Sequence, residues 1–377
     1  MVEMSIEDQV SDETTSANAG ILRIGKVSAA LPNKFATTAE MNATRIVGTK
    51  DTLPGEVVVS AKLMYPDSLR RILEKEDSLR DFARRVSRES GGFEDVARLL
   101  FLVFKGEAAY NSAEDLRTLL DLQYFADMDV ITVQQAAGMS PDDFASLLRF
   151  ATRWMDQKGV DKPIMPILQA SETQREFELF SSPVLKSKSR LLGVDMRGGF
   201  HYYTLRAVEK IKKKHPGTWI HAFQNPPKIR FARHMLSSSQ GMLMPYFGVD
   251  SYSRWVVPPP PVPLTKDKIN VFDKSGWGVF KRNEWTELHG KKLTCACPMC
   301  KGQNLDGFYT GKVLSVLSRS KVHDHYAQQD ELKKASESIR KHEYSRLIKT
   351  KKHAKLFVGE LKKALEAEAK SAPRLRQ

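Results

Sequence analysis

Three cysteines lie within six residues in the last third of the chain, at Cys295, Cys297 and Cys300. Thiolates are ligands that zinc favours, and a tetrahedral structural site needs one further ligand. The nearby histidines that could supply that ligand are His289, His323 and His325. Of these, His289 is the weaker candidate. Three thiolates and one imidazole, with no carboxylate, form a closed set. The sequence therefore predicts a structural Zn²⁺ site that takes no direct part in catalysis.

The chain is strongly basic. Its 377 residues include 59 Lys and Arg against 45 Asp and Glu, which gives a formal net charge of +14. Such a surplus predicts a polyanionic partner such as nucleic acid, because Lys and Arg that contact phosphates release condensed counterions. No stretch approaches the roughly 20 apolar residues that cross a bilayer. Because all three cysteines share one motif, a disulfide scaffold is excluded and a reducing cytoplasm is favoured.

Short apolar runs alternate with amphipathic segments along most of the chain. Residues 140–159 form a predicted helix, with Ser140 as its N-cap and Pro141 at the first helical position. Residues 201–217 form a second predicted helix. Near-continuous apolar strands separated by helices predict a parallel sheet that is covered on both faces, and so many units favour an α/β fold of the (β/α)8 barrel type. The predicted strands are residues 56–61, 97–104, 129–134, 163–170, 190–196, 218–223 and 242–250.

The barrel is predicted to span residues 21–290. The acidic, Ser/Thr-rich residues 1–20 read as a disordered tail. Residues 291–345 form the predicted zinc-binding subdomain, and residues 346–377 a basic C-terminal helix. The prolines between Val256 and Lys268 cannot continue a helix or a central strand. This segment is therefore predicted to leave the barrel. Two basic runs, residues 210–214 and 349–353, are either solvated helix faces or phosphate contacts, and we favour phosphate contacts for the second.

The cysteine spacing, followed by a histidine that heads a long helix, resembles the zinc motif of the queuine and archaeosine tRNA-guanine transglycosylases. This resemblance selects His323 as the fourth ligand and covers roughly residues 120 to 345 in order and spacing. Residues 248–253 resemble the strand-end segment that carries the family's nucleophilic aspartate, which places the nucleophile at Asp250. A carboxylate at the carboxyl end of a barrel strand is well placed to attack the anomeric carbon of a sugar.

The resemblance also implies a set of residues that bind the base, and aromatic side chains beside the pocket would hold an extruded base. The implied base-binding residues are Gln169, Gly193, Val194, Asp195, Gln135 and Tyr252. Asp195 is also a candidate for proton transfer. The aromatic candidates are Tyr246, Phe247, Tyr252 and Trp255, although Phe247 is more typical of a core residue.

Two departures from the family pattern are visible. The family's second aspartate lies in an Asp-Ser-Gly-Gly-Phe-Gln string, and here the nearest string runs from Glu89 to Asp95. Either Glu89 replaces that aspartate, or Asp95 serves, or the string is a coincidence. The family's base-selecting aspartate is replaced by Gln134 and Gln135.

These departures favour the divergent relatives that insert 7-deazaguanine derivatives into DNA. The resemblance implies a pentosyltransferase that replaces guanine in DNA by a 7-deazaguanine base, such as 7-cyano-7-deazaguanine, through a covalent intermediate at Asp250. It implies no organic cofactor, and it implies partner proteins of a DNA-modification system. A tRNA substrate is one alternative. A non-catalytic, zinc-containing subunit that binds nucleic acid is the other.

Overall fold

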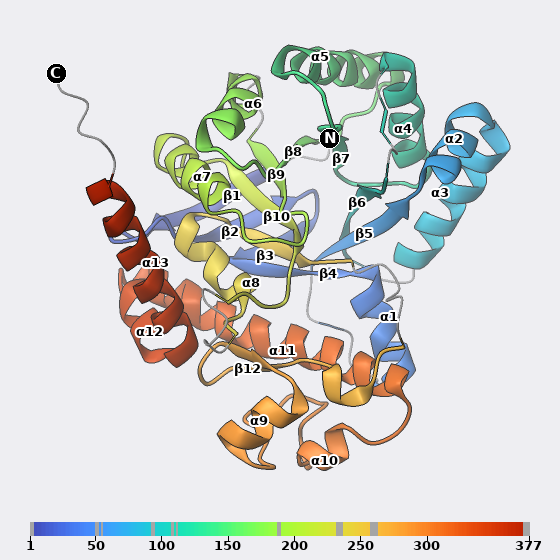
Figure 1. Ribbon diagram of the computed structural model, residues 1–377. Coiled ribbons are helices and arrows are strands. Elements are labelled where there is room, and N and C mark those ends of the chain that lie inside the picture. The colour runs from blue at the N-terminus through green and yellow to red at the C-terminus, as the bar shows by residue number, and fades with distance from the viewer. Residues whose placement is uncertain are drawn as a thin grey trace.

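Eight parallel strands form the centre of the protein (Figure 1). The computed structural model describes residues 4–49, 53, 56–91, 95–106, 109–110, 112–186, 190–230, 237–256 and 263–371. The strands follow one another in chain order around the sheet, from β4 to β11, and β11 pairs with β4. A parallel bridge between Leu99 and Val130 joins the two remaining edges. The strands are β4 (Asn33–Thr37), β5 (Val57–Met64), β6 (Ala97–Phe104), β7 (Ile131–Gln134), β8 (Ile164–Gln169), β9 (Leu191–Asp195), β10 (Trp219–Asn225) and β11 (Ser251–Arg254). The predicted (β/α)8 barrel is confirmed.

A side-chain amide completes the seam between β6 and β7. The backbone N–H of Leu102 donates to Oε1 of Gln134 at 2.9 Å, and Nε2 of Gln134 donates to the carbonyl of Leu102 at 2.8 Å. The amide of Gln134 thus pairs with β6 as a backbone peptide would, where β7 itself is too short to continue the ladder. Gln134 therefore has a structural role at the edge of the barrel mouth.

The N-terminal residues close the end of the barrel at which its strands begin. β1 (Met4–Ser11), β2 (Asn18–Ile24) and β3 (Val27–Leu31) form an antiparallel sheet, so the predicted disordered tail is wrong for the described residues from Met4 onward. Apolar residues of this sheet share one core with residues that begin the barrel strands, among them Val57, Ala97, Leu191 and Trp219. Burial of these apolar side chains orders a segment whose composition alone suggested disorder.

Helices cover the outside of the barrel. Those that follow the first six barrel strands are α1 (Thr38–Val47), α2 (Pro66–Glu74), α3 (Glu76–Ser90), α4 (Ala113–Phe125), α5 (Pro141–Lys158), α6 (Gln174–Lys186) and α7 (Tyr202–Lys214). The predicted cap of α5 is confirmed, because the Ser140 side chain accepts from the N–H of Asp143 and Pro141 begins the helix. The predicted strand over residues 242–250 is wrong. That segment contains α8 (Gln240–Leu243) and the 3₁₀ helix η1 (Met244–Phe247), in which Pro245 starts the turn and Gly248, at φ 84°, ends it.

The last barrel helix is α11 (Val313–Arg340), which packs against α1 and β4. Nε2 of Gln329 on this helix donates to Oδ1 of Asn33 at 2.7 Å and to the carbonyl of Lys34 at 2.6 Å. Between β11 and α11 the chain forms a separate lobe, which contains η2 (Lys266–Lys268), β12 (Val271–Asp273), β13 (Gly278–Phe280), α9 (Arg282–His289) and α10 (Leu305–Phe308). This lobe is an insertion before the eighth helix, and we refer to it as the metal-binding lobe.

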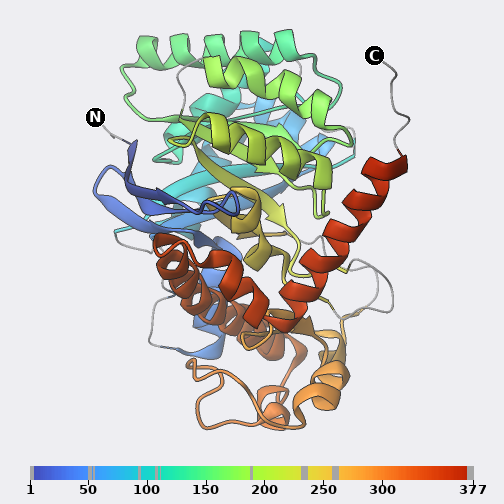
Figure 2. The same ribbon diagram turned by 90° about the vertical axis from the view of Figure 1, so that its left-hand side faces the viewer.

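Two C-terminal helices, α12 (Tyr344–Thr350) and α13 (Lys352–Ser371), cover α8 and η1. The Tyr344 hydroxyl donates to the carbonyl of Met242, and the ring of Phe357 packs edge-on against Phe200 at 5.3 Å. Figure 2 shows α13 running obliquely beside the barrel, with its far end projecting from the body. In the part of the chain that the structure describes, no helix is both long and apolar enough to cross a membrane.

Candidate active site and metal centre

A cavity of about 260 Å³ opens at the carboxyl ends of the barrel strands. Barrel enzymes carry their reacting groups at this end. The polar side chains that line it, and the indole of Trp255, come from the ends of six strands, β6 to β11. The polar residues are Lys105, Gln134, Gln135, Gln169, Asp195, Arg197 and Gln224. Three of the residues predicted to bind a base, namely Gln135, Gln169 and Asp195, therefore lie together in one cavity.

Gln135, the residue after β7, and Gln169, the last residue of β8, hold each other in place. The backbone N–H of Gln169 donates to Oε1 of Gln135 at 2.9 Å, and Nε2 of Gln169 donates to the carbonyl of Gln135 at 3.1 Å. These bonds fix which end of each amide is oxygen and which is nitrogen. Among the described residues, no other group bonds to the amide N–H groups of Gln135 or to the amide oxygen of Gln169. The pair therefore offers adjacent donors and an acceptor, as the edge of a purine requires.

Asp195 ends β9 and supplies a carboxyl group to the cavity. Its Oδ1 accepts a hydrogen bond from the backbone N–H of Arg197 at 2.9 Å. Burial raises the pKa of Asp195 to about 6, although this hydrogen bond and the charges of Arg197 and Lys105 act in the opposite direction. Among the described residues that line the cavity, Asp195 is the one carboxyl group. A carboxyl group that titrates near neutrality in a cleft is a candidate for chemistry.

The rim of the cavity holds two residues in an uncommon backbone conformation. Gln224 has φ 54° and Arg197 has φ 49°, which is the left-handed region that favours glycine. Such residues gather at functional sites. Beside them, Gly198 lies against the indole of Trp255, so that a Cβ at Gly198 would come within 2.7 Å of Trp255 Cε2. Sequence reasoning missed Arg197 and Gln224, because no residue type there signals a positive φ. Of the four aromatic candidates, Trp255 lines this cavity.

Asp250 does not lie in this cavity. It precedes β11 instead of ending a strand, so the predicted position is wrong, and its side chain is 1% exposed. Its Oδ2 lies 2.7 Å from Nζ of Lys212 and accepts from the backbone N–H of Ile220 at 2.8 Å. Burial raises the pKa of Asp250, and the adjacent Lys212 opposes that shift. The geometry is that of a buried structural ion pair at the amino-terminal end of the barrel.

Replacing Asp250 by Asn should destabilise the protein, because the buried Lys212 loses its counter-charge. Removing one partner of such a pair costs about 3–5 kcal/mol, which urea denaturation would measure as a lower midpoint. A double variant, Asp250→Leu with Lys212→Met, should recover much of this loss, because it leaves no uncompensated charge. A stable Asp250→Asn variant that has lost all base exchange would instead restore Asp250 as a reacting group.

The two candidates for the second acid also lie outside the cavity. Glu89 is on α3 and forms an ion pair with Lys62 on the outer side of β5. Asp95, at φ 55°, precedes β6 and so belongs to the amino-terminal end of the barrel. Residues 92–94 of the same string lie outside the described residues. Neither placement brings Glu89 or Asp95 to the cavity, so neither supports a role in proton transfer there.

Three further residues that were predicted to bind the base have structural roles in this fold. Gly193 pairs with both neighbouring strands, and a Cβ there would lie 2.7 Å from Ile167 Cγ1 inside the barrel. Val194 is fully buried on the outer face of β9. The Tyr252 hydroxyl donates to Oε1 of Gln328 on α11 at 3.0 Å, so its ring is directed away from the cavity. Phe247 is a core residue, as predicted.

The cysteine motif and His323 form one compact group. The ligand atoms of Cys295, Cys297, Cys300 and His323 all lie within 4.8 Å of one another, and the group could hold a metal ion. Nδ1 of His323 lies 3.4 Å from Sγ of Cys297 and 3.2 Å from Sγ of Cys300. Of the candidate histidines, His323 is the one that lies with the three cysteines in this group.

The hydrogen bonds that hold His323 in place support metal binding by this group. Nε2 of His323 lies 2.7 Å from the carbonyl of Phe272, to which it donates, so Nδ1 is left with a lone pair that faces the thiols. The adjacent Asp324 accepts from the backbone N–H of Phe272 at 3.0 Å. His289 lies instead beside Asp273, at 3.5 Å. Three sulfur ligands and one nitrogen ligand are the set that structural zinc takes.

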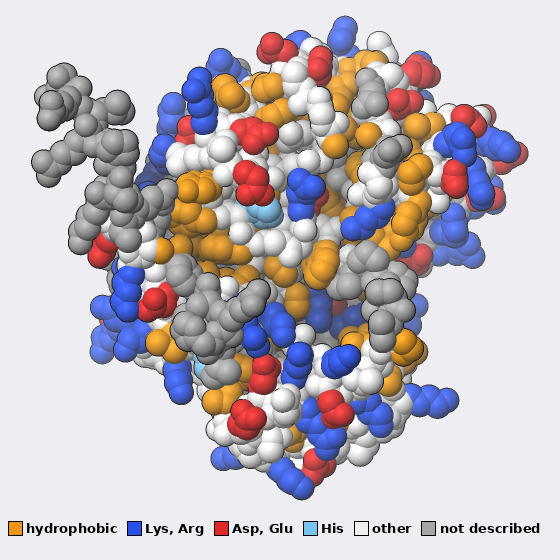
Figure 3. Space-filling model, viewed as in Figure 1, with side chains coloured by type: hydrophobic (Ala, Val, Ile, Leu, Met, Phe, Trp, Pro, Cys, Tyr) orange, Lys and Arg blue, Asp and Glu red, His pale blue; other side chains and the backbone are white. Residues whose placement is uncertain are grey.

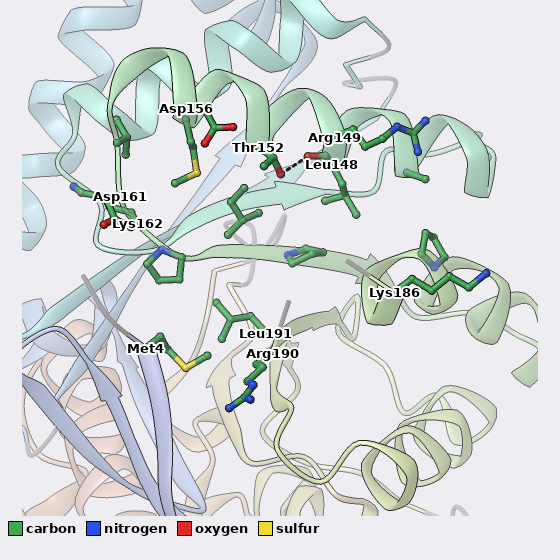
Figure 4. Close-up of a pocket in the computed structure, with 17 residues that line it drawn as sticks. Met4, Leu148, Arg149, Thr152, Asp156, Asp161, Lys162, Lys186, Arg190 and Leu191 are labelled. Carbon is green, nitrogen blue, oxygen red and sulfur yellow. Dashed lines mark hydrogen bonds between the residues drawn. The ribbon is translucent and has the colours of Figure 1, made fainter. Parts of the chain in front are cut away.

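A larger cavity lies at the other end of the barrel (Figure 4). It has a volume of about 760 Å³ and opens between α5, the end of α6 and the first residues of β8 and β9. Its lining contains Arg149, Lys186 and Arg190 above an apolar floor, but none of the predicted site residues. In barrel folds the amino-terminal face serves stability rather than catalysis, so the smaller cavity is the candidate active site.

Comparison with known proteins adds little to this geometry. No protein-family profile matches the chain, and no curated protein matches its sequence. Two solved structures share parts of the fold. A presumed phosphonomutase from Burkholderia cenocepacia J2315 has 10% identity and a TM-score of 0.36, over 59% of this chain and 85% of that one. A 2,3-dimethylmalate lyase of the PEP mutase/isocitrate lyase superfamily has 8% identity and a TM-score of 0.37, over 59% and 76%. Likenesses this weak carry no inference about activity.

Proposed function

We propose that the protein is a base-exchange transglycosylase that replaces guanine in nucleic acid, with DNA favoured, by a 7-deazaguanine base. The observation that carries the proposal is the convergence of Gln135, Gln169 and Asp195 in one cavity at the carboxyl ends of the strands. The same three residues are among those that the sequence resemblance implies for base binding. The amide pair suits the polar edge of a purine-like base, and Trp255 offers a flat surface on which such a base would stack.

In this proposal Asp195 is the reacting carboxylate. Its oxygen displaces guanine from C1′ of the sugar and forms a covalent ester, and the incoming base then displaces Asp195 from the same carbon. Two inversions restore the β configuration. The exchange is neutral in protons, because the incoming base loses the N–H proton that guanine gains on leaving. Gln135 and Gln169 hold the base, and the charges of Lys105 and Arg197 favour the ionised form of Asp195.

The metal-binding lobe has a structural part in this proposal. A bound Zn²⁺ would fix Cys295, Cys297 and Cys300 against His323 on α11, and it would contribute no reacting ligand. One observation favours a second candidate function, a non-catalytic subunit that binds nucleic acid. Double displacement in related chemistry uses two carboxyl groups, and among the described residues that line the cavity Asp195 is the one carboxyl group.

A labelled-base experiment tests the proposal. The zinc-loaded protein is incubated with radiolabelled 7-cyano-7-deazaguanine and, in separate reactions, with duplex DNA or tRNA. Stable incorporation into DNA supports the favoured function, and incorporation into tRNA identifies the alternative substrate. A covalent adduct that survives denaturation should form with the wild-type protein when guanine is released. Binding of both polymers without incorporation or adduct would support the non-catalytic subunit.

A further inference from the structure

A small three-part ladder follows the carboxyl end of β10. Ile229 pairs with Ser238 in an antiparallel bridge, and Ser238 in turn pairs with Gly278 of β13. The backbone N–H of Val279 also donates to the carbonyl of Ser237 at 3.1 Å. This ladder joins the barrel to the metal-binding lobe, because β13 belongs to that lobe. It places the residues around Ile229 beside those that follow β13.

Three cations flank this ladder, and we call Lys228, Arg230 and Lys281 the junction cluster. One carboxylate accompanies them: Glu284 lies 2.8 Å from the guanidinium of Arg230 and caps the backbone N–H of Lys281. Nζ of Lys228 donates to the neutral amide of Asn270 at 3.0 Å. In the part of the chain that the structure describes, neither Lys228 nor Lys281 forms an ion pair with a carboxylate. The cluster therefore keeps a positive charge of two after Glu284 is counted.

The positive charges of the junction cluster affect one another. Burial lowers the pKa of Lys228, and the nearby charges of Lys281 and Arg230 lower it further, against the opposing charge of Glu284. Like charges that are held together in a half-buried position are unfavourable without an anion to receive them. Figure 3 shows Lys and Arg side chains gathered where the barrel adjoins the metal-binding lobe.

The junction cluster lies close to the candidate active site. Lys228 is three residues beyond Asn225, which ends β10, and the carbonyl of Asn225 accepts from the backbone N–H of Trp255 at 2.9 Å. Trp255 lines the cavity. A nucleic-acid strand with one base in the cavity must continue past its rim, and each strand of a duplex carries one phosphate per about 3.4 Å of helix axis. The next phosphates can therefore fall within reach of the cluster.

The two basic runs seen in the sequence are less suited to this role. On α7, Lys212 is buried against Asp250, and Lys210 lies 3.1 Å from Glu178. In the C-terminal run, Lys351 lies 2.5 Å from Glu331 and over the ring of Trp277. Much of the charge in both runs therefore serves internal contacts.

We propose that the junction cluster binds the phosphodiester backbone of the nucleic acid beside the base that occupies the cavity, an inference that rests on the proposed function. Lys228 and Lys281 each contact a phosphate oxygen. Arg230, held by Glu284 and by Ser237 Oγ at 2.7 Å, orders the surface between them. The recognition is of backbone charge, so it is independent of base sequence.

The test removes two charges at the junction and two at a matched control position. The double variant Lys228→Gln/Lys281→Gln is compared with Lys349→Gln/Lys352→Gln, whose two lysines are exposed on α12 and α13. Fluorescence anisotropy gives the Kd for labelled duplex DNA and tRNA over a series of salt concentrations. The junction variant should lose about 1.4–1.8 from the slope of log K against log salt, which corresponds to two phosphate contacts. The control variant should keep the wild-type slope.

The experiment separates failure of the phosphate contacts from failure of the proposed function. An unchanged slope in the junction variant, or an equal loss in the control, would overturn the phosphate contacts. Binding of free 7-cyano-7-deazaguanine, followed by quenching of tryptophan fluorescence, should be the same in the junction variant and in the wild type. Failure of the wild-type protein to bind the free base would count against the proposed function alone, because the salt dependence of polymer binding does not require an occupied base pocket.

Discussion

Base exchange should fall about 10⁴-fold when Asp195 is replaced by Asn, because the amide cannot form the covalent ester with the sugar. Asn has nearly the same shape, and the described contact of Asp195 is one hydrogen bond from the backbone of Arg197 to Oδ1, which an amide oxygen also accepts. The fold should therefore be retained. Single-turnover incorporation of labelled base measures the loss of rate, and the denaturation-resistant adduct should be absent.

The same carboxyl group predicts how the activity depends on pH. The pKa of Asp195 is raised to about 6 by burial, so the protonated, unreactive form persists to a higher pH than for an exposed aspartate. Base exchange should fall as the pH decreases through about 6 and should be near its plateau at pH 7.5 to 8. A profile of kcat/KM against pH measures this value in the free enzyme.

Two variants serve as controls for Asp195. Glu89→Gln removes a carboxylate that pairs with Lys62 on the outside of the barrel, so it should leave the rate of exchange within about twofold. Asp250→Asn should lose stability rather than chemistry. An Asp195→Asn protein that still forms the covalent adduct would exclude Asp195 as the nucleophile. Loss of the adduct in Glu89→Gln would restore the string from Glu89 to Asp95 as part of the site.

Removal of a bound metal should lower the free energy of unfolding by a large amount. A metal present at about 1000 times its Kd stabilises the folded state by about 4 kcal/mol, and that contribution disappears when a chelator is added. Because His323 lies on the eighth barrel helix, the loss should reach the barrel as well as the lobe. Urea denaturation with and without chelator measures the change in the free energy of unfolding, and elemental analysis of the purified protein identifies the metal.

Histidine variants assign the effect to the proposed ligands. His323→Gln should lose the bound metal and, with it, the sensitivity of stability to chelator. His289→Gln should keep both, because His289 lies beside Asp273 and not among the cysteines. Equal metal content in the two variants would contradict the assignment of His323. A chelator that removes metal without changing stability would show that the lobe folds without it.

Local patterns predict a large part of this molecule. Six of the seven predicted strands exist, since long apolar runs such as residues 97–104 read as buried strands from their own composition. The four residues of the group that could hold a metal ion were equally predictable, because the cysteine spacing is short and the histidine heads a predicted helix. Gln169 and Asp195 follow from the same rule, since they are the last residues of recognisable strands.

What could not be predicted depends on contacts between distant residues. β4 contains Lys34, which reads as a surface residue, yet it is buried because Glu40 lies 2.8 Å away. Lys212 looks like one member of a solvated basic run, but it is the counter-charge of Asp250, 38 residues later. Without that partner in view, Asp250 reads as a strand-end acid. The apolar residues 242–250 suggest a strand because the helices that bury them lie about 100 residues further along the chain.

The contact between Gln329 and Asn33 has a consequence for how the chain folds. These two residues, 296 positions apart, join the eighth barrel helix to the first barrel strand. During synthesis, the outer side of β4 must therefore stay uncovered until α11, almost 300 residues later in the chain, has left the ribosome. Contacts of such long sequence separation form late and slowly, and apolar surface exposed in the interval is prone to aggregation. Closure of the barrel by α11 is thus expected to be a late step of folding, and a step at which chaperones would act.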